Sequence, residues 1–211
     1  MLHSDIFTNK IAYVNLYFDA QSVPQEHIQY LFLLTDLLGA VDTESHTYAE
    51  LSNLSNLHTG GISYENSAAV RNGEPDSCMP MFRVRARAFG RNLPELFSLL
   101  TEVLTESKFT DKKRLEELCG QCRAILEARV MSASQRSMAV RIASYLSPAG
   151  AYNEQAMLSY YGFLADLTDH FEERFEELSE TLASLLPIVF TKGGLTVGVT
   201  LSEAEYASFA E

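Results

Sequence analysis

The chain has 211 residues, of which 46% are hydrophobic and 21% charged, a composition typical of a folded globular protein rather than a disordered segment. Acidic residues outnumber basic ones by 28 to 16, for a formal net charge of −12, and this balance argues against a nucleic-acid partner because phosphate contacts need a basic surface. Three cysteines do not indicate a disulfide framework, and no run approaches the roughly 20 apolar residues that cross a bilayer, so we expect a cytoplasmic chain without a membrane partner.

The first part of the chain predicts a strand followed by two helices. Residues 11–18 are rich in β-branched and aromatic side chains, which favour a strand, and residues 5–8 are a candidate edge strand. A second, shorter helix is expected to start at Thr47, because Thr47 and Glu50 have the spacing of a capping box. The first helix follows Pro24, and its apolar side chains recur at helical spacing at Ile28, Leu31, Phe32, Leu34 and Leu38.

A β-hairpin follows the pair Gly60 and Gly61, where the second helix is expected to end. Its strands are expected at residues 62–70 and 81–89, on either side of a turn over residues 71–76 that contains Asn-Gly and Pro-Asp. Because side chains in a strand point alternately to its two faces, a period of two indicates that only one face meets a core. The second strand has this period, with Phe82, Val84, Ala86 and Ala88 on one face and Arg83, Arg85 and Arg87 on the other.

After the hairpin the sequence predicts helices up to one last strand. Apolar residues recur at helical spacing, and caps or breakers divide the segments. In chain order we expect a helix capped by Asn92, a long helix that starts after Thr110 or Asp111 and breaks near residues 132–134, a loop at residues 147–150, a long helix over residues 153–185 with a kink at Gly162, a strand at residues 195–200 and a short acidic helix at residues 202–211.

This order of elements predicts an α+β fold. Strands joined by a short turn are antiparallel, and the simplest packing is a two-layer sandwich in which helices cover one face of a mainly antiparallel sheet. No linker or internal repeat divides the sequence, so residues 1–211 are interpreted as a single domain. Because the chain starts just before a strand and stops after a short helix, we expect it to be a fragment of a larger chain.

Several segments resemble one family. Residues 8–19, 48–51 and 57–63 are similar to the opening strand, the helix and the double-glycine strand of the third domain of presequence-protease-like peptidases, a branch of the insulinase/pitrilysin-type zinc metallopeptidases. Residues 161–164 and 195–200 also fit, so the resemblance covers essentially the whole chain. It implies a metallopeptidase-domain-like fold in an enzyme of four similar domains, whose two halves close over a peptide-sized chamber.

The same resemblance implies that this domain is noncatalytic. The first domain of the family binds zinc through His-x-x-Glu-His on a helix, where two histidines share the metal and the glutamate is the general base. In the equivalent helix, Leu33 and Leu37 stand at the histidine positions and Asp36 at the glutamate position. Leucine has no lone pair, so we expect no cofactor in this chain and zinc only in the catalytic domain of the parent protein. Glu116 and Glu117 lie near the position of the third ligand and are expected to be surface charges.

Two other motifs have structural interpretations. Residues 170–174 are similar to a zinc motif, but Arg174 stands where the second histidine is needed, and arginine cannot ligate a metal. We expect an acidic helix face on which Arg174 pairs with its neighbours. Cys119 and Cys122 form a Cys-x-x-Cys within a helical pattern, which is not the setting of a redox site. Cys119 is therefore expected to be packed and Cys122 partly exposed.

The polar face of the hairpin is the candidate site. If the strands pair in register, the arginines share one face of the sheet with polar residues of three other strands. The resemblance implies that the sheets of the domains line the chamber, and exposed tyrosines and arginines often carry contact energy, so we predict that this face contacts an oligopeptide substrate or a neighbouring domain. The alternative is a solvated face with an arginine–glutamate pair worth about 0–1 kcal/mol. The candidates are Tyr13, Asn15, Tyr17, Ser63, Glu65, Arg83, Arg85 and Arg87, joined by Ser67, Thr196 and Thr200.

Three functions remain open. The first is a noncatalytic domain of a zinc-dependent, oligopeptide-degrading metalloendopeptidase, which is inactive alone, helps to form the chamber and contacts other domains of the same polypeptide. The second is an inactive scaffold or interaction protein of the same fold, and the third is a peptide-binding module. The acidic excess adds a further hypothesis, since an acidic chamber wall would attract basic peptides, although the charges of residues 166–180 are expected to face outward.

Overall fold

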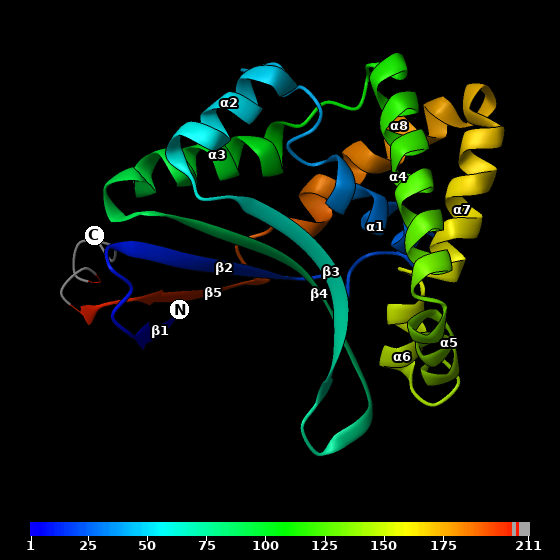
Figure 1. Ribbon diagram of the computed structural model, residues 1–211, viewed down its shortest axis with the longest axis horizontal. Helices are drawn as coiled ribbons and strands as arrows, with labels where there is room; N and C mark the ends of the chain where they lie inside the picture. Colours follow the sequence, from blue (N-terminus) through cyan, green and yellow to red (C-terminus); the bar gives the residue numbers. More distant parts are fainter. Residues whose placement is uncertain (204–205, 207–211) are drawn as a thin grey trace.

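The computed structural model describes residues 1–203 and residue 206 (Figure 1). Its strands form one sheet in the order β1-β5-β2-β4-β3. The pairs β5-β2, β2-β4 and β4-β3 are antiparallel, whereas β1 runs parallel to β5. The strands are β1 (Leu2–Asp5), β2 (Ile11–Asp19), β3 (Ile62–Arg71), β4 (Glu74–Phe89) and β5 (Leu195–Leu201).

The helices pack against the apolar face of the sheet and extend past its β3 edge (Figure 1). This arrangement confirms the predicted α+β fold with a mainly antiparallel sheet. The helices are α1 (Ile28–Leu37), which follows a 3-10 turn (Gln25–His27), α2 (Tyr48–His58), α3 (Leu93–Glu106), α4 (Lys112–Ser132), α5 (Ser134–Ala143), α6 (Pro148–Glu154), α7 (Leu158–Asp169) and α8 (Phe171–Val189).

The predicted helix ends agree with the structure at several positions. Thr47 and Glu50 form a complete capping box at the start of α2. The Asp111 side chain accepts a hydrogen bond from a backbone N–H of the first turn of α4 at 3.0 Å, and the break between α4 and α5 falls at Ala133. Asn92 does precede α3, but its side chain donates to a carbonyl at the end of α2 at 3.1 Å instead of capping α3.

The long helix expected over residues 153–185 is wrong, because this part of the chain forms α6, α7 and α8. Residues 147–150 are not a loop but the start of α6, which is capped by a serine. The backbone leaves helical geometry at Met157 and at His170, whereas Gly162 lies inside α7. The breaks let α7 pack against α4 and α8 pack against α1, which are contacts that one straight helix cannot make together.

Two strand boundaries also differ from expectation. The edge strand lies at Leu2–Asp5 rather than at residues 5–8, because the chain reverses through Asn9 and Lys10, both with positive φ, before β2. Strand β4 starts at Glu74, well before residue 81, so the hairpin turn is short; the prolines in this segment hid the strand, since proline is rare in paired strands. The acidic helix expected at residues 202–211 lies almost entirely outside the described residues.

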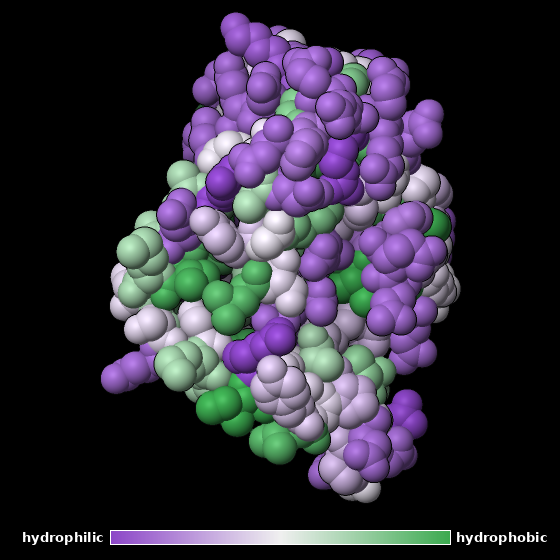
Figure 2. All heavy atoms as spheres, turned by 90° about the vertical axis from the view of Figure 1, so that its right-hand side faces the viewer, coloured by the Kyte–Doolittle hydropathy of each residue, from purple (hydrophilic) through white to green (hydrophobic). Residues whose placement is uncertain are grey.

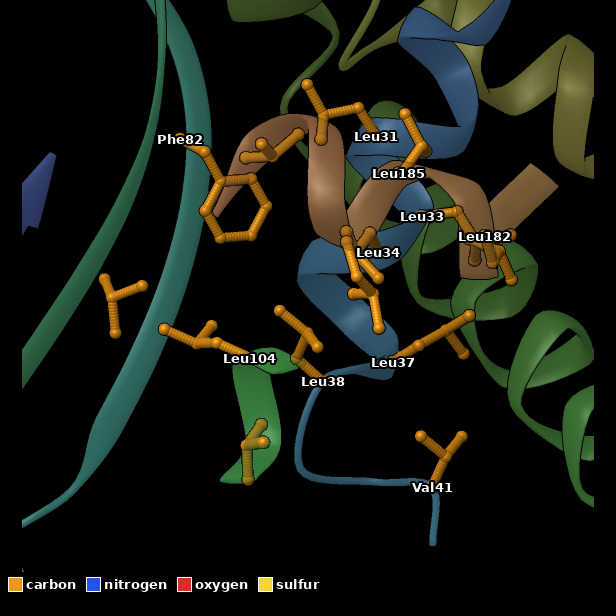
Figure 3. Packing of buried hydrophobic residues seen from close by; sticks show 14 of the residues in the cluster. Leu31, Leu33, Leu34, Leu37, Leu38, Val41, Phe82, Leu104, Leu182 and Leu185 are labelled. Atoms are coloured by element: carbon orange, nitrogen blue, oxygen red, sulfur yellow. The ribbon is translucent and has the colours of Figure 1, made fainter. Parts of the chain in front are cut away.

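The core lies between the sheet and helices α1 and α8. Figure 3 shows Phe82 of β4 pointing from the sheet toward the leucines of these two helices, and its ring meets that of Phe190 edge to face at 5.2 Å between centroids. Helix α1 is apolar on every side, since Leu31, Leu33, Leu34 and Leu37 are all fully buried. A helix of this kind needs cover on its outer side as well, which α7, itself packed on α4, provides.

Candidate functional site

The eight candidate residues lie on one face of the sheet. Tyr13 stands opposite Arg87, Asn15 opposite Arg85, and Tyr17 opposite Arg83. On the other side of β4, Ser63 stands opposite Arg85 and Glu65 opposite Arg83. Since side chains alternate along a strand, these residues project away from the core. We call this set the polar sheet face: Tyr13, Asn15, Tyr17, Ser63, Glu65, Arg83, Arg85 and Arg87.

Strand β5 extends the polar sheet face on the far side of β2. Thr200 stands opposite Tyr13 and Thr196 opposite Tyr17, as the alternation in the sequence predicts. Between them, Gly198 stands opposite Asn15 and adds no side chain. The strands therefore pair in the expected register, while contact with a substrate stays a prediction.

Arg87 is held close to the two glycines that precede β3. Its Nε donates to the carbonyl oxygen of Gly60 at 2.6 Å, and the N–H of Gly60 donates to the carbonyl oxygen of Arg87 at 2.7 Å. A Cβ at Gly60 would lie 2.9 Å from Cγ of Arg87, and Gly61 has a φ of +121°. The double glycine thus provides the close approach and the backbone conformation that join the end of α2 to the sheet.

The polar sheet face is basic, although the chain as a whole is acidic. It carries three arginines and one glutamate, a formal charge of +2, and Glu65 forms an ion pair with Arg83, which agrees with the pairing expected for a solvated face. Among the described residues, no carboxylate lies within ion-pairing distance of Arg85, which is exposed. Exposed acidic side chains are found instead on α8, at Glu172, Glu173, Glu176, Glu177 and Glu180. An acidic wall is therefore not what this face provides.

An open hollow of about 290 Å³ lies on this face. Tyr13, Asn15, Ser63, Arg85 and Arg87 line it, together with the glycines before β3. Phenol, amide, hydroxyl and guanidinium groups here can donate hydrogen bonds to carbonyl or carboxylate oxygens. None of these groups is arranged as a nucleophile with a base, so the hollow can bind and orient a peptide but has no evident means of cleaving it.

The residues at the degenerate zinc positions do not fit a metal. Leu33 and Leu37 are 0% exposed and belong to the core. Asp36 accepts a hydrogen bond from the Tyr160 hydroxyl at 3.0 Å, and burial raises the pKa of its carboxyl above the usual value. Within the described part of the chain, no three potential ligands are grouped closely enough to hold a metal ion. Glu116 and Glu117 are exposed on α4, as expected.

The other two motifs have the structural roles predicted for them. Arg174 pairs with Asp166 at 2.5 Å and with Glu177 at 3.5 Å. Cys119 is buried and Cys122 partly buried, and burial raises the pKa of each thiol to about 12. Such thiols stay protonated at neutral pH, so they are poor nucleophiles.

One hollow was missed by the sequence reasoning. It has a volume of about 300 Å³ and lies between β3 and α4, above α1 and α7; we call it the β3–α4 groove. No motif announces it, because its residues come from five separate segments. Its polar lining consists of Thr35, Asp36, Glu65, Asn66, Cys122, Arg129 and Tyr160, and its apolar lining includes Phe32, Tyr64, Ile125, Leu126 and Ala156.

Apolar side chains also gather on the surface of α5 and the turn after it. Figure 2 views the molecule from the side of α4 to α7 and shows apolar residues clustered over its lower half. Met138, Ile142, Tyr145 and Leu146 are each more than half exposed. In residues 1–203 we find no helical span with the length and hydropathy of a transmembrane segment.

Comparisons with known proteins agree with the resemblance seen in the sequence. Residues 1–167 match the family model of the domain associated with subfamily C of the M16 peptidases. The chain is 31% identical to Protein HypA of Clostridium perfringens over its whole length and to Presequence protease 1, chloroplastic/mitochondrial, of Arabidopsis thaliana over 95% of its length. It covers 22% and 18% of these two proteins, about a fifth of their length.

A solved structure shares the fold. The crystal structure of a conserved protein from Enterococcus faecalis V583 superposes with a TM-score of 0.64 over 99% of this chain and 48% of that chain, at 14% identity. This likeness supports the fold alone. Since the family model covers most of the sequence, the chain belongs to the family of domains associated with subfamily C of the M16 peptidases, in agreement with the predicted resemblance to presequence-protease-like members of the insulinase-type peptidases.

Proposed function

We propose that residues 1–211 form one noncatalytic domain of a zinc-dependent metalloendopeptidase that degrades oligopeptides, and that the polar sheet face is part of the wall of its closed substrate chamber. The observation that carries this proposal is the combination of an open, hydrogen-bonding face with aliphatic residues at the zinc positions. Zinc and bond cleavage then belong to another domain of the same polypeptide. The names of the relatives support a peptidase as the parent protein.

The polar sheet face would act by orienting the peptide. Arg85 is exposed and free of carboxylate partners among the described residues, so its guanidinium can donate to a peptide carboxylate or carbonyl. The Tyr13 and Tyr17 rings flank it along β2 and offer flat contact area at low entropic cost. Arg83, already paired with Glu65, would contribute less.

The test is a charge reversal in the complete parent enzyme. Arg85→Glu is expected to lower kcat/KM for oligopeptide cleavage about tenfold, the size of one lost charge-assisted contact. The matched control is Arg136→Glu, which reverses an exposed arginine on α5, away from the sheet. Equal kcat/KM for the two variants would rule out the chamber-wall proposal.

The scaffold or interaction protein remains the second candidate, and the exposed apolar cluster on α5 favours it. Met138, Ile142 and Leu146 form a surface of the kind found at protein contacts. The two candidates differ in one observation: a parent reading frame with His-x-x-Glu-His upstream supports the peptidase. We keep the cytoplasm as the proposed location, although the name of the Arabidopsis relative places that protein in chloroplasts and mitochondria.

A further inference from the structure

The outer edge of β3 is occupied at one point by a side chain that imitates a peptide group. The N–H of Ala68 donates to Oδ1 of Asn153 at 2.8 Å, and Nδ2 of Asn153 donates to the carbonyl oxygen of Ala68 at 2.9 Å. These are the two hydrogen bonds that a neighbouring strand makes with one residue of an antiparallel ladder. Asn153 lies in α6, so a helix side chain ends the open edge at Ala68.

The same edge is open above Ala68. Backbone direction alternates along a strand with a period of two, so Ile62, Tyr64 and Asn66 also turn their N–H and C=O groups away from β4. In the described part of the chain, β3 is the last strand of the sheet and pairs only with β4. The backbone of Tyr64 and Asn66 therefore faces the β3–α4 groove, whose opposite wall is formed by α4.

A buried donor in this groove has no partner. Asn66 is only 6% exposed; its Oδ1 accepts from the Tyr152 hydroxyl at 3.0 Å, while no described residue accepts from its Nδ2. An unpaired buried amide costs about 1–3 kcal/mol, and a carbonyl oxygen placed in the groove would remove that cost.

The remaining lining suits a polypeptide rather than a small anion. Asp36 and Arg129 provide charges of opposite sign, while Phe32, Ile125 and Leu126 provide apolar walls. An extended peptide offers alternating donors and acceptors to the strand edge and side chains to the pocket, a common mode of peptide recognition. The net charge of −12 favours a basic peptide.

We propose that the β3–α4 groove binds an extended oligopeptide as an added strand on β3, with its main chain paired to Tyr64 and Asn66, one of its carbonyls accepting from Nδ2 of Asn66, and a side chain directed toward Asp36. The proposal rests on the proposed function for the source of the peptide, an oligopeptide substrate. It adds a second contact site, on the edge of the sheet rather than on its polar face. Asn153 limits how far the peptide can extend along β3.

The direct test is a titration of the ¹⁵N-labelled 211-residue chain with an octapeptide of alternating threonine and lysine, followed by NMR. The amide signals of Tyr64 and Asn66 are expected to shift and their hydrogen exchange to slow. The same octapeptide with alternate backbone nitrogens methylated is expected to bind about tenfold more weakly, because it loses one or two hydrogen bonds to the strand edge.

A pair of equally exposed isoleucines supplies matched variants. Ile125 is 60% exposed on the groove wall, and Ile142 is 59% exposed on α5. Ile125→Lys is expected to weaken binding of the octapeptide about fivefold through like charge and lost apolar contact, while Ile142→Lys leaves it unchanged. Both substitutions are on helix surfaces and keep a good helix former, and circular dichroism checks that both variants fold.

The outcomes separate this proposal from the proposed function. Shifts confined to Tyr13, Asn15 and Arg85 would overturn the groove proposal and leave the chamber-wall proposal standing. Shifts at Tyr64 and Asn66 support the groove, even if Arg85→Glu leaves peptide cleavage by the parent enzyme unchanged. No shift at any amide, or equal effects of the two isoleucine variants, also overturns the groove proposal.

Discussion

The guanidinium Nε of Arg87 lies 2.6 Å from the carbonyl oxygen of Gly60 and donates to it. Gly60 in turn donates its N–H to the backbone carbonyl of Arg87 at 2.7 Å. The end of α2 is thereby fastened to β4 in the position that starts β3 beside it. A side chain of the polar sheet face is thus also part of the structure that builds the face.

We expect Gly60→Ala to destabilise the chain by about 1–2 kcal/mol, in the range for forced overpacking. The new Cβ would lie 2.9 Å from Cγ and 3.0 Å from Nε of Arg87, so Arg87 must move and its bond to residue 60 is lost. Urea unfolding measures the change. Gly193→Ala is the control, since a Cβ there meets no atom within 4 Å; similar midpoints for the two variants would show that the approach is not tight.

Asn153→Ala is expected to cost about 2 kcal/mol of unfolding free energy, since two hydrogen bonds to Ala68 are lost together. The amide of Ala68 should also exchange faster with solvent than in the parent chain. Asn53→Ala, at an exposed position on α2, is the control. Unchanged exchange at Ala68 would contradict the role given to Asn153.

The sequence predicted the polar sheet face well and these two contacts not at all. The alternation of arginine with apolar residues in β4 defines a face without any knowledge of the partner strands, because the period of two is a local property. In contrast, Arg87 meets Gly60 across 27 residues of sequence and Asn153 meets Ala68 across 85. Such contacts depend on where α2 and α6 are packed, and no local pattern encodes that.

The helix breaks had the same limit. Ala133 was predicted from a run of small polar residues, while the turn at Met157 has no glycine or proline near it. It is produced by the packing of α7 on α4. Gly162, a residue that favours a kink in isolation, is instead held inside α7, because tertiary packing overrides a weak local preference.

Stability should depend on pH through His46. Its Nδ1 lies 2.9 Å from Oε1 of Glu102, and this hydrogen bond raises the pKa of the imidazole above its usual value of about 6.5. Because the folded-state pKa is the higher one, the contribution is fully present below pH 6.5 and is lost as the pH rises through the raised value. Glu102→Gln should remove it, so the urea midpoint of the variant should change less between pH 5.5 and 8.5. An NMR titration of His46 with an ordinary pKa would contradict this assignment.

The thiols of Cys119 and Cys122 should react slowly. Burial raises the pKa of both to about 12, and only the thiolate is a good nucleophile. At pH 8, iodoacetamide is expected to modify both more slowly than free glutathione in the folded chain, and at a similar rate after unfolding in guanidinium. Fast modification in the folded chain, or a disulfide formed in air, would revive a redox role for this pair.

The last prediction concerns metal. The purified chain is expected to bind no stoichiometric zinc, because Leu33 and Leu37 are buried aliphatic residues at the positions where the related catalytic helix carries histidines. Titration with zinc, read by calorimetry and by metal analysis after dialysis, checks this. The double substitution Leu33→His with Leu37→His is not expected to restore a site. Both side chains face the core, where two imidazoles would lose apolar packing and lack the water-accessible position that catalytic zinc requires. The double variant should therefore unfold at lower urea concentration, with or without zinc. A zinc-dependent rise in its stability would show instead that the core can open into a metal site, and that the loss of the histidines alone separates this domain from a catalytic one.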